Sequence, residues 1–562
     1  MFSRLLSEAK PSEGEDEGKP EKGKLHRFLN SQTGGIGAAA GILAISALVS
    51  RFLGLIRDRL LAGTFGASPE LDSYFAAFRI PDLVYSILIA GGVIVAFLPL
   101  FSEYFLKNQK EAWRFVNNVL SIFLFFLVLI SLGILIFAPT LIKLITPGFN
   151  PEQINLTVLL TRILFLSPIL LGLSSIFSGV LQYFNRFLAY SLTPVLYNLG
   201  IIFGILFIVP YFGILGVAIG VILGAFFHFA IQIPSALSCG FRYQPVFNFK
   251  APGLKRVFLL MAPRTFAVAS WQINLIVITA IASTLTTGSI TIFNLANNLQ
   301  YLPLGIIGTA FATAAFPFLS RFWANHQDGK FIEAFSSALR QTLYFIFPVT
   351  FLMYLLRNQI VEIVLEQGEF SQVAAQLTAV SLGLFCLGTI ALSLVPLLSR
   401  IFFSFQDTKT PTLITLVVML LNIALSFYFV RLLAPASSFG FGAGFQIFLK
   451  NVFSLQDIQN ISILGLPLAW SIGSIFHFLL LITFLYKRIG DFKLKEIFSS
   501  FLKILLASIL MTAGALFVIQ NTSGAVFQTV AAGLAAGLIY LLATFLLKSP
   551  ELKTVKTRIF KK

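Results

Sequence analysis

Charged residues are scarce in this sequence. Only 11% of its 562 residues are Asp, Glu, Lys or Arg, whereas 57% are hydrophobic and the mean hydropathy is +0.88. This polar content is far too small to cover a soluble globule of that size, which excludes an ordinary soluble protein. The chain is therefore an integral membrane protein, and its 62 Phe residues suit helices that face lipid.

Cysteine and histidine are also rare. The two cysteines, Cys239 and Cys386, show no CxxC spacing and are predicted to pack as small apolar residues. The four histidines are scattered along the chain, so no metal site and no cofactor are expected. GxSxG, Walker and HExxH patterns do not occur, and nothing indicates ATP coupling. Enzyme classes are therefore poor first choices.

Long apolar segments fill most of the chain. Each is at or beyond the roughly 20 residues that cross a bilayer as a helix, which predicts about fourteen membrane spans. They fall at residues 33–62, 70–102, 116–145, 155–182, 188–211, 213–238, 257–285, 289–319, 335–356, 374–403, 411–432, 462–486, 498–520 and 524–547.

The loops between these spans alternate in charge. Those after even-numbered spans hold Lys and Arg, whereas those after odd-numbered spans are nearly free of them, and TPGFNPEQIN and TTGS hold none. By the positive-inside rule both termini are expected in the cytoplasm. The net charge of +17 thus reflects orientation in a membrane, and no nucleic-acid partner is expected.

Three segments lie outside the spans. Residues 1–31 are polar and predict a disordered cytoplasmic tail, with no pattern of a cleaved signal peptide. Residues 433–461 predict a longer outer loop with a short interfacial helix. The C-terminal KSPELKTVKTRIFKK is basic and amphipathic enough to lie on anionic lipid as a cytoplasmic tail.

Besides Glu70, the apolar hairpin SRFLGLIRDRLLAGTFGASPELDSYFAAFRIPDL carries seven charged residues: Arg51, Arg57, Asp58, Arg59, Asp72, Arg79 and Asp82. Each ionised side chain at a helix centre in a bilayer costs about 2.5 to 3.5 kcal/mol, so such groups survive mainly where they line a polar cavity. Asp72 is expected near the outer end of the second span, with Arg79 and Asp82 deeper. Because Arg79 and Asp82 are three residues apart, they could form a structural ion pair or line a cavity.

Two further cations fall inside predicted spans, Arg162 in the fourth and Arg264 in the seventh. The intramembrane set is thus richer in Arg than in acid. Guanidinium groups bind phosphate in a planar, bidentate way, so an Arg-lined cavity favours an anionic ligand.

The charged hairpin, followed by VAFLPLFSEY, resembles the first two spans of the MurJ/MviN lipid II flippases, members of the MOP exporter superfamily. The resemblance covers about residues 33–490. Further matches occur in the same order: TPVLYNLGII at 193–202, PRTFAVASWQINL at 263–275, LPLGIIGTAFATAAFPFLS at 302–320, VLEQGEF at 364–370 and FFSFQDTKTP at 402–411.

The resemblance implies an all-α integral membrane fold of about fourteen helices, with two pseudo-symmetric six-helix lobes around a central cavity and two C-terminal helices. The implied division is an N-lobe at 32–240, a C-lobe at 241–490, and the last two spans with a basic tail at 491–562. The implied activity is the movement of lipid II, an undecaprenyl-pyrophosphate-linked precursor, from the inner to the outer leaflet by alternating access. The location would be the bacterial cytoplasmic membrane.

By this resemblance Arg51, Arg57 and Asp72 match family positions tied to activity, and Asp58 matches the Arg-Asp pair of that motif. Where the family usually places an Arg, this chain has Asn297 and Asn298. Arg79 and Arg264 are hypothesised to supply part of the missing cavity charge. The candidate substrate contacts are therefore Arg51, Arg57, Asp58, Asp72, Arg79, Arg264, Asn297 and Asn298.

Some relatives carry a sodium site from acids on spans seven and eleven, where this chain has Ile278, Asn422 and Ser426. No metal is therefore assigned. Three alternatives stay open: an exporter of another polyprenyl-linked oligosaccharide or small molecule, a membrane-embedded transferase, and a noncatalytic scaffold for cell-wall machinery. Besides lipid II and membrane lipids, cell-wall synthesis or division proteins remain open as partners.

Overall fold

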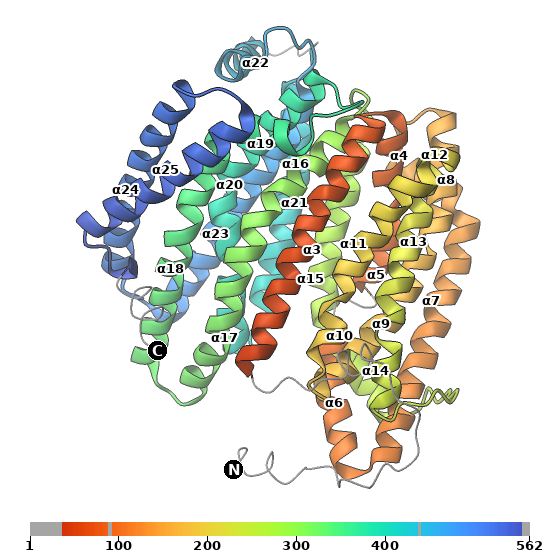
Figure 1. The fold of residues 1–562 in the computed structure, drawn as a ribbon. Helices are drawn as coiled ribbons and strands as arrows, with labels where there is room; N and C mark the ends of the chain where they lie inside the picture. Colours follow the sequence, from red (N-terminus) through yellow and green to blue (C-terminus); the bar gives the residue numbers. More distant parts are fainter. Residues whose placement is uncertain (1–35, 88–92, 436–439, 553–562) are drawn as a thin grey trace.

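The computed structural model describes residues 36–87, 93–435 and 440–552, and these residues form helices and no strand. The expected tail at 1–31 and the last ten residues lie outside the described part. Two helix bundles stand side by side, and a further helix pair flanks the second bundle (Figure 1). This arrangement confirms the all-α membrane fold class predicted from the sequence.

The first bundle is built from residues 36–238. Its elements are α3 (Ile36–Phe65), α4 (Pro69–Ala77), α5 (Arg79–Tyr85), α6 (Val93–Lys107), α7 (Gln109–Ile145), α8 (Pro151–Leu164), α9 (Leu166–Tyr183), α10 (Phe187–Ser191), α11 (Thr193–Phe203), η2 (Gly204–Ile208), α12 (Val209–Phe212), α13 (Ile214–Ala230) and α14 (Ile233–Ser238).

The second bundle and the flanking pair follow. The bundle elements are α15 (Pro252–Ser283), α16 (Ser289–Pro303), η3 (Leu304–Gly308), α17 (Thr309–Ala324), α18 (Asp328–Leu355), α19 (Arg357–Val364), α20 (Gln372–Ser404), α21 (Lys409–Leu432), α22 (Gly440–Phe453), η4 (Ser462–Leu464) and α23 (Gly465–Ile489). The pair is α24 (Leu494–Gln520) and α25 (Ala525–Leu546). Helix α15 packs against both bundles, on α21 and on α6.

Eleven helical stretches of the described chain are long and apolar enough to cross a membrane. They correspond to the expected spans three to six and eight to fourteen. The remaining three expected spans are α3, the α4–α6 segment and α15. The count of fourteen therefore stays a prediction.

Several expected spans are broken rather than continuous. The second expected span, residues 70–102, is divided, because α4 ends at Ala77 and α5 begins at Arg79. Pro81 has no N–H to continue the helical ladder, which explains a break one turn earlier. The fourth span likewise divides at Phe165, just before Pro168. Such breaks are tolerated where neighbouring helices re-satisfy the backbone groups.

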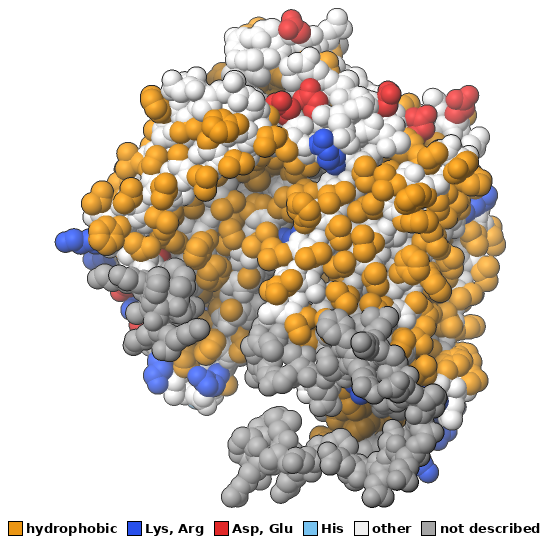
Figure 2. Space-filling view, viewed as in Figure 1, with side chains coloured by type: hydrophobic (Ala, Val, Ile, Leu, Met, Phe, Trp, Pro, Cys, Tyr) orange, Lys and Arg blue, Asp and Glu red, His pale blue; other side chains and the backbone are white. Residues whose placement is uncertain are grey.

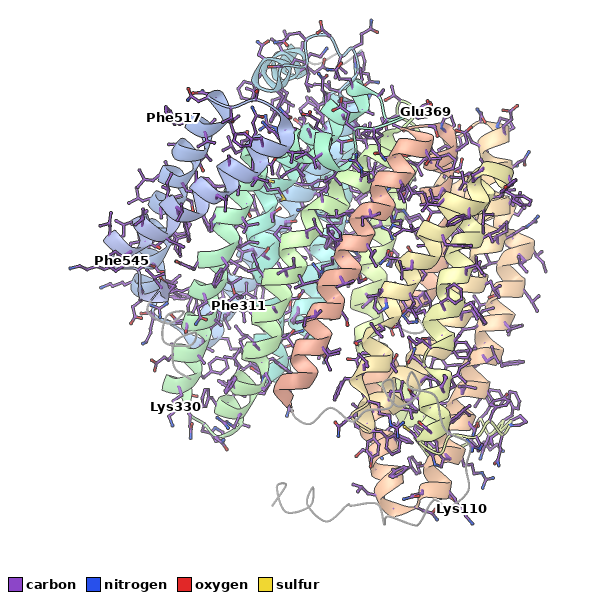
Figure 3. The ribbon with its side chains drawn as sticks, in the orientation of Figure 1. Lys110, Phe311, Lys330, Glu369, Phe517 and Phe545 are labelled. Atoms are coloured by element: carbon purple, nitrogen blue, oxygen red, sulfur yellow. The ribbon has the colours of Figure 1, made fainter. Side chains whose placement is uncertain are left out.

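The surface matches a bilayer setting. Figure 2 shows a broad band of hydrophobic side chains, with most Asp and Glu side chains above it and most Lys and Arg below it. The two ends are marked by Lys110 and Lys330 on one side and Glu369 on the other (Figure 3). We call these the basic end and the Glu369 end. The expected helix in the 433–461 loop is confirmed as α22.

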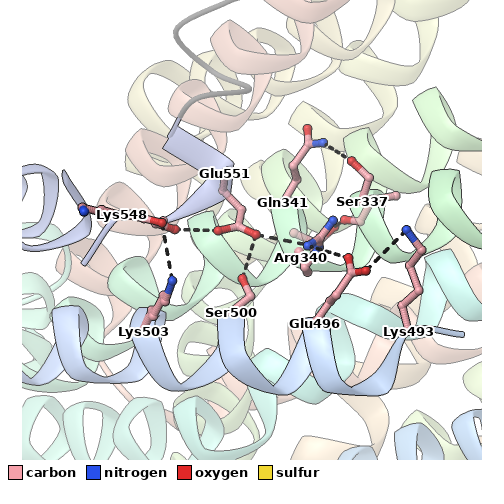
Figure 4. A network of polar contacts seen from close by, with 12 residues as sticks. Ser337, Arg340, Gln341, Lys493, Glu496, Ser500, Lys503, Lys548 and Glu551 are labelled. Atoms are coloured by element: carbon pink, nitrogen blue, oxygen red, sulfur yellow. Dashed lines mark hydrogen bonds and ion pairs between the residues drawn. The ribbon is translucent and has the colours of Figure 1, made fainter. Parts of the chain in front are cut away.

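A polar network fastens the end of α25 to the second bundle (Figure 4). The Glu551 carboxylate accepts hydrogen bonds from Ser500 (2.7 Å) and Ser549 (2.5 Å), and it lies 3.8 Å from the Arg340 guanidinium. Arg340 also pairs with Glu496 at 3.4 Å. Glu551 is only 3% exposed. The start of the basic C-terminal segment is thus bound to the protein.

This network predicts that Glu551→Ala destabilises the fold. The substitution leaves two buried hydroxyls without their acceptor, at a cost of about 2 kcal/mol. Thermal unfolding in detergent should show a lower midpoint. Glu496→Ala is the matched control, because an exposed ion pair contributes about 0 to 1 kcal/mol. An equal shift for the two variants would contradict this ranking.

Candidate functional site

A polar cavity of about 290 Å³ lies between the two bundles. Its walls come from α3, α4, α5 and α11 of the first bundle and from α15 and α16 of the second. The lining residues are Arg57, Leu61, Tyr74, Phe75, Phe78, Arg79, Asp82, Tyr197, Ile201, Leu275, Asn294, Asn297 and Asn298.

The second bundle faces this cavity with a row of amides on α16. Asn294, Asn297 and Asn298 are spaced i, i+3 and i+4, which places them on one face of a helix. The oxygen of Asn297 is buried and has no hydrogen-bond partner among the described residues. The α16 face is therefore polar but uncharged, so the positive charge must come from the first bundle.

Arg57 is fixed by its sequence neighbour and by α11. Its Nε and Nη2 donate to one oxygen of Asp58 at 2.9 and 2.7 Å, and its Nη1 donates to Asn198 at 3.3 Å. The other Asp58 oxygen accepts from Asn298 of α16 at 2.9 Å. Asp58 is only 4% exposed. The Asp58 carboxylate thus orients the Arg57 guanidinium and links it to the second bundle.

Arg79 reaches across to the second bundle by hydrogen bonds to neutral groups. Its Nε donates to Thr279 and its Nη2 donates to Asn294, both at 2.7 Å. The considered ion pair with Asp82 is wrong, because no Arg79–Asp82 contact within ion-pair distance occurs among the described side chains. The physical reason is that the long Arg79 side chain reaches two acceptors of the second bundle, Thr279 on α15 and Asn294 on α16. Arg79 therefore keeps a charge without a contacting counter-ion.

Asp72 caps a helix of the opposite bundle. Its two oxygens accept from the Gly288 N–H at 2.7 Å, the Thr291 N–H at 2.8 Å and the Thr291 hydroxyl at 2.7 Å. Helix α16 has no side-chain cap of its own, since Gly288 holds that position with φ 86°. A carboxylate at a helix N-terminus satisfies unpaired N–H groups and complements the helix dipole. Asp72 thus joins the bundles at the Glu369 end.

Other contacts close the same end. The Glu369 N–H donates to the Gly63 carbonyl at 2.9 Å, and Gln367 donates to the Arg59 carbonyl at 3.2 Å. The Arg59 guanidinium in turn donates to the Ile363 carbonyl. One apolar cluster also spans both bundles here, with Ala62, Ala76 and Phe149 packed among residues of α16, α19 and α20. This end of the cavity is sealed by polar and apolar contacts together.

The remaining predicted residues lie elsewhere. Arg51 donates to the Leu302 carbonyl at 3.0 Å, beside Pro303 and the π turn η3, and it is not part of the cavity lining. Arg264 belongs to α15, but its side chain lies outside the described residues. The cavity therefore brings together Arg57, Arg79, Asn297 and Asn298, with Asp58 directly behind Arg57.

Three functional candidates were missed from the sequence: Asn198, Thr279 and Asn294. Asn294 shares a helical face with Asn297 and Asn298, so the spacing alone was a usable signal. Asn198 lies inside the TPVLYNLGII motif. Thr279 gave no such signal, because a lone Thr in an apolar helix commonly bonds its own backbone, as it also does here to Leu275 at 2.8 Å.

A separate, small cavity of about 50 Å³ lies within the second bundle. Asn274, Asn422, Trp470 and His477 are among its lining residues, and the lining holds no Asp or Glu. Among the residues that the structure describes, no group of three or more His, Cys, Asp or Glu is arranged to hold a metal ion.

A polytopic helical protein whose two bundles enclose a charged cavity sealed at one end belongs to the class of membrane transporters. Comparison with known families is more specific. The family model for the lipid II flippase MurJ matches residues 61–445, and the chain belongs to this family.

Curated relatives agree over most of the chain. A probable lipid II flippase MurJ of Buchnera aphidicola subsp. Acyrthosiphon pisum is 30% identical over 465 residues, covering 80% of this chain and 91% of the relative. The lipid II flippase MurJ of Burkholderia cenocepacia is 29% identical over 410 residues, covering 70% and 79%.

Solved structures show the same fold. A lipid II flippase MurJ in an inward closed conformation superposes with a TM-score of 0.72 at 26% identity, covering 92% of this chain and 99% of the other. An inward-facing multidrug resistance MATE transporter of the MOP superfamily gives a TM-score of 0.63 at 16% identity, covering 81% and 99%. The MATE similarity supports the MOP fold alone.

The trans cap predicts that Asp72→Asn loosens the Glu369 end. The Asn side chain offers one acceptor oxygen and carries no charge. The closed arrangement of the bundles at the Glu369 end should therefore lose about 1 to 2 kcal/mol of stability. A thiol placed in the cavity by Phe75→Cys, with Cys239 and Cys386 replaced by Ala, should react roughly tenfold faster with an impermeant maleimide added at that end.

Glu70→Gln is the control for this experiment. Glu70 lies two residues before Asp72 in the first turn of α4, is exposed, and bonds to no described residue of the second bundle. It should leave the labelling rate unchanged. Equal rates in the Asp72→Asn variant and the parent would contradict the cap as a closure element.

Proposed function

We propose that this chain moves lipid II from the inner to the outer leaflet of the bacterial cytoplasmic membrane by alternating access. Membership of the lipid II flippase MurJ family supports this proposal, as do relatives of that name. The observation that carries it within the structure is Arg79, a buried cation bonded only to neutral groups at the wall of a cavity between two bundles.

The cavity chemistry suits a diphosphate. A guanidinium held by Thr279 and Asn294 can exchange a neutral acceptor for a phosphate oxygen without breaking an ion pair. Arg57 lines the same cavity and is oriented by Asp58. The Asn297 and Asn298 amides add polar groups for the sugars or phosphate. In this proposal Arg51 and Asp72 hold the two bundles in position relative to each other, whereas Arg57 and Arg79 contact the ligand.

Transport requires the closed end to open. In the proposed cycle the headgroup enters at the basic end and meets Arg57 and Arg79. The bundles then rock, and the Asp72 cap and the Gly63–Glu369 contact separate. The polyprenyl tail stays in the bilayer. An inside-negative potential favours outward movement of an anion by about 2.3 kcal/mol per charge per 100 mV, which biases the cycle toward export.

The proposed orientation places the basic end and both termini in the cytoplasm, in agreement with the distribution of Lys and Arg (Figure 2). We assign the N-lobe to residues 32–240, the C-lobe to 241–490 and the C-terminal unit to 491–562. The proposed role is transport and not catalysis. Lipid II and membrane lipids are the proposed partners, with cell-wall synthesis or division proteins as further candidates.

Arg57→Ala and Arg79→Ala should each abolish or strongly reduce flipping. Losing a charge-assisted hydrogen bond to phosphate costs about 1.5 to 3 kcal/mol, roughly ten- to a hundredfold in affinity. The measurement is lipid II headgroup accessibility in cells depleted of their own flippase and supplied with each variant. Membrane levels of the variants should be compared by immunoblot.

Arg162→Ala is the matched control. Arg162 is exposed on α8, donates to the Leu135 carbonyl at 3.1 Å and is not part of the cavity lining, so flipping should persist. Full rescue by both cavity variants would exclude Arg57 and Arg79 as substrate contacts. Failure of the unsubstituted chain to expose lipid II would overturn the proposed function.

Thiol labelling in intact cells tests the orientation. In a chain without Cys239 and Cys386, Glu369→Cys should react with an impermeant maleimide added outside. Lys110→Cys and Lys330→Cys should react only after the cells are opened, because they lie at the basic end (Figure 3). The reverse labelling pattern would contradict a cytoplasmic basic end.

A further inference from the structure

Asp82 is the one charged group of the cavity wall whose role the proposed cycle leaves unassigned. It lies on α5, one turn after Arg79, and its carboxylate has no hydrogen-bond partner and no ion pair among the described residues. The two other Asp residues of the hairpin, Asp58 and Asp72, each accept two or more hydrogen bonds. A carboxylate that lines a cavity without a bonded partner is free to bind a proton or a ligand.

Asp82 also lines a second cavity, of about 190 Å³, inside the first bundle. The two cavities share Phe78, Asp82 and Tyr197, so Asp82 lies at their boundary. Tyr85, Ser167 and His228 are further polar residues of the second cavity.

The described side chains that face Asp82 include few charges. Helices α8, α9, α15 and α16 contribute only neutral groups to the two cavities, among them Ser167, Leu275 and Asn294. The charged or titratable ones are Arg57 on α3, Tyr74 on α4, Arg79 and Tyr85 on α5, Tyr197 on α11 and His228 on α13.

We propose that Asp82 is a proton-binding site whose occupancy is linked to binding of the diphosphate in the central cavity. This inference rests on the proposed function, and it adds a second ligand, the proton. When the diphosphate enters, Asp82 takes up one proton from water in the cavities; when the diphosphate leaves, Asp82 releases it.

The charge balance of the cavity gives the direction of this linkage. Arg57 and Asp58 form a contacting pair, which leaves Arg79 and Asp82 as two opposite charges out of contact. With Asp82 ionised these four side chains sum to zero, and with Asp82 protonated they sum to one positive charge. A dianion therefore binds better to the protonated form, and by reciprocity its binding favours protonation. Affinity for the diphosphate should fall as pH rises.

A proton suits this position better than a metal cation. Arg79 is three residues away on the same helix, and Arg57 lies on the same cavity, so a second fixed cation would be repelled. A proton instead removes the negative charge and leaves the carboxyl group free to donate a hydrogen bond. No cluster of acids or histidines around Asp82 is present in the described chain to complete a metal site.

A buried chain of hydrogen bonds continues from the second cavity toward the end of α9. The Ser174 hydroxyl is 2.7 Å from Nδ1 of His228, Gln232 donates to Ser174, and Ser178 donates to Gln232 at 2.9 Å. The Tyr197 and His228 rings lie edge to face, 6.5 Å between centroids. His228 is thus the second titratable candidate, and the test has to separate it from Asp82.

The experiment measures binding of purified lipid II to the detergent-solubilised chain by calorimetry at pH 5.5 and pH 8. The diphosphate diester of lipid II keeps both charges over this range, so a pH effect comes from the protein. The unsubstituted chain should bind about tenfold more weakly at pH 8. Repeating the titration in two buffers with different heats of ionisation should show uptake of a proton on binding.

Two variants show whether Asp82 or His228 binds the proton. Asp82→Asn mimics the protonated carboxyl group and should keep the tighter, low-pH affinity at both pH values. His228→Gln should keep the pH dependence of the unsubstituted chain. Thermal unfolding should confirm that both variants are folded. Loss of the pH dependence in His228→Gln, with retention in Asp82→Asn, would assign the proton to His228 and overturn the inference.

Further outcomes distinguish failure of this inference from failure of the proposed function. Equal affinity at both pH values, or no proton uptake, overturns the Asp82 site and leaves the flippase proposal intact. A dependence on sodium instead of pH, seen when choline replaces sodium, overturns the proton as the ligand. Absence of lipid II binding at either pH, together with failure to rescue flippase-depleted cells, overturns the proposed function and this inference with it.

Discussion

A buried carboxylate and a buried helix N-terminus cannot both remain without partners inside an apolar protein. The Asp72 carboxylate and the N-terminus of α16 are hydrogen-bonded to each other across the boundary between the bundles, with three bonds of 2.7 to 2.8 Å. The Glu369 end of the protein is closed by this contact and by the apolar cluster around it. Because neither group can move away without losing solvation, the closed arrangement is a discrete state and not one point on a continuous range.

The charged side chains of the cavity have different kinds of partner. Asp58 neutralises Arg57 directly, whereas Arg79 is solvated by a hydroxyl and an amide of the second bundle. Neutral partners stabilise a guanidinium less than a carboxylate does and leave its charge available to a ligand. The two arginines therefore differ in function even though they line one cavity. One is oriented by an acid, and the other is held ready for an anion.

The sequence predicts the general architecture well because hydrophobic length and loop charge are local properties. It also predicts that the hairpin charges line a cavity, since their cost in lipid demands one. The partners of those charges are not predictable in the same way. Asp72 binds residues 216 and 219 positions away, and Arg79 binds residues 200 and 215 positions away. A local rule favours Asp82 for Arg79 at i+3, but the tertiary fold brings Thr279 and Asn294 of the second bundle within hydrogen-bond distance of Arg79 instead.

Helix α3 connects these features. It packs along α10 and α11 of the first bundle, yet it bonds to the second bundle at three levels: Arg51 to Leu302, Asp58 to Asn298, and Gly63 to Glu369. A rocking motion that opens one end and closes the other changes distances most at the ends and least at the middle. The Asp58–Asn298 contact is the middle one of the three, and the same Asp58 carboxylate orients Arg57. The contact between the bundles and the arginine that faces the cavity therefore share one carboxylate, so a change at either one affects the other.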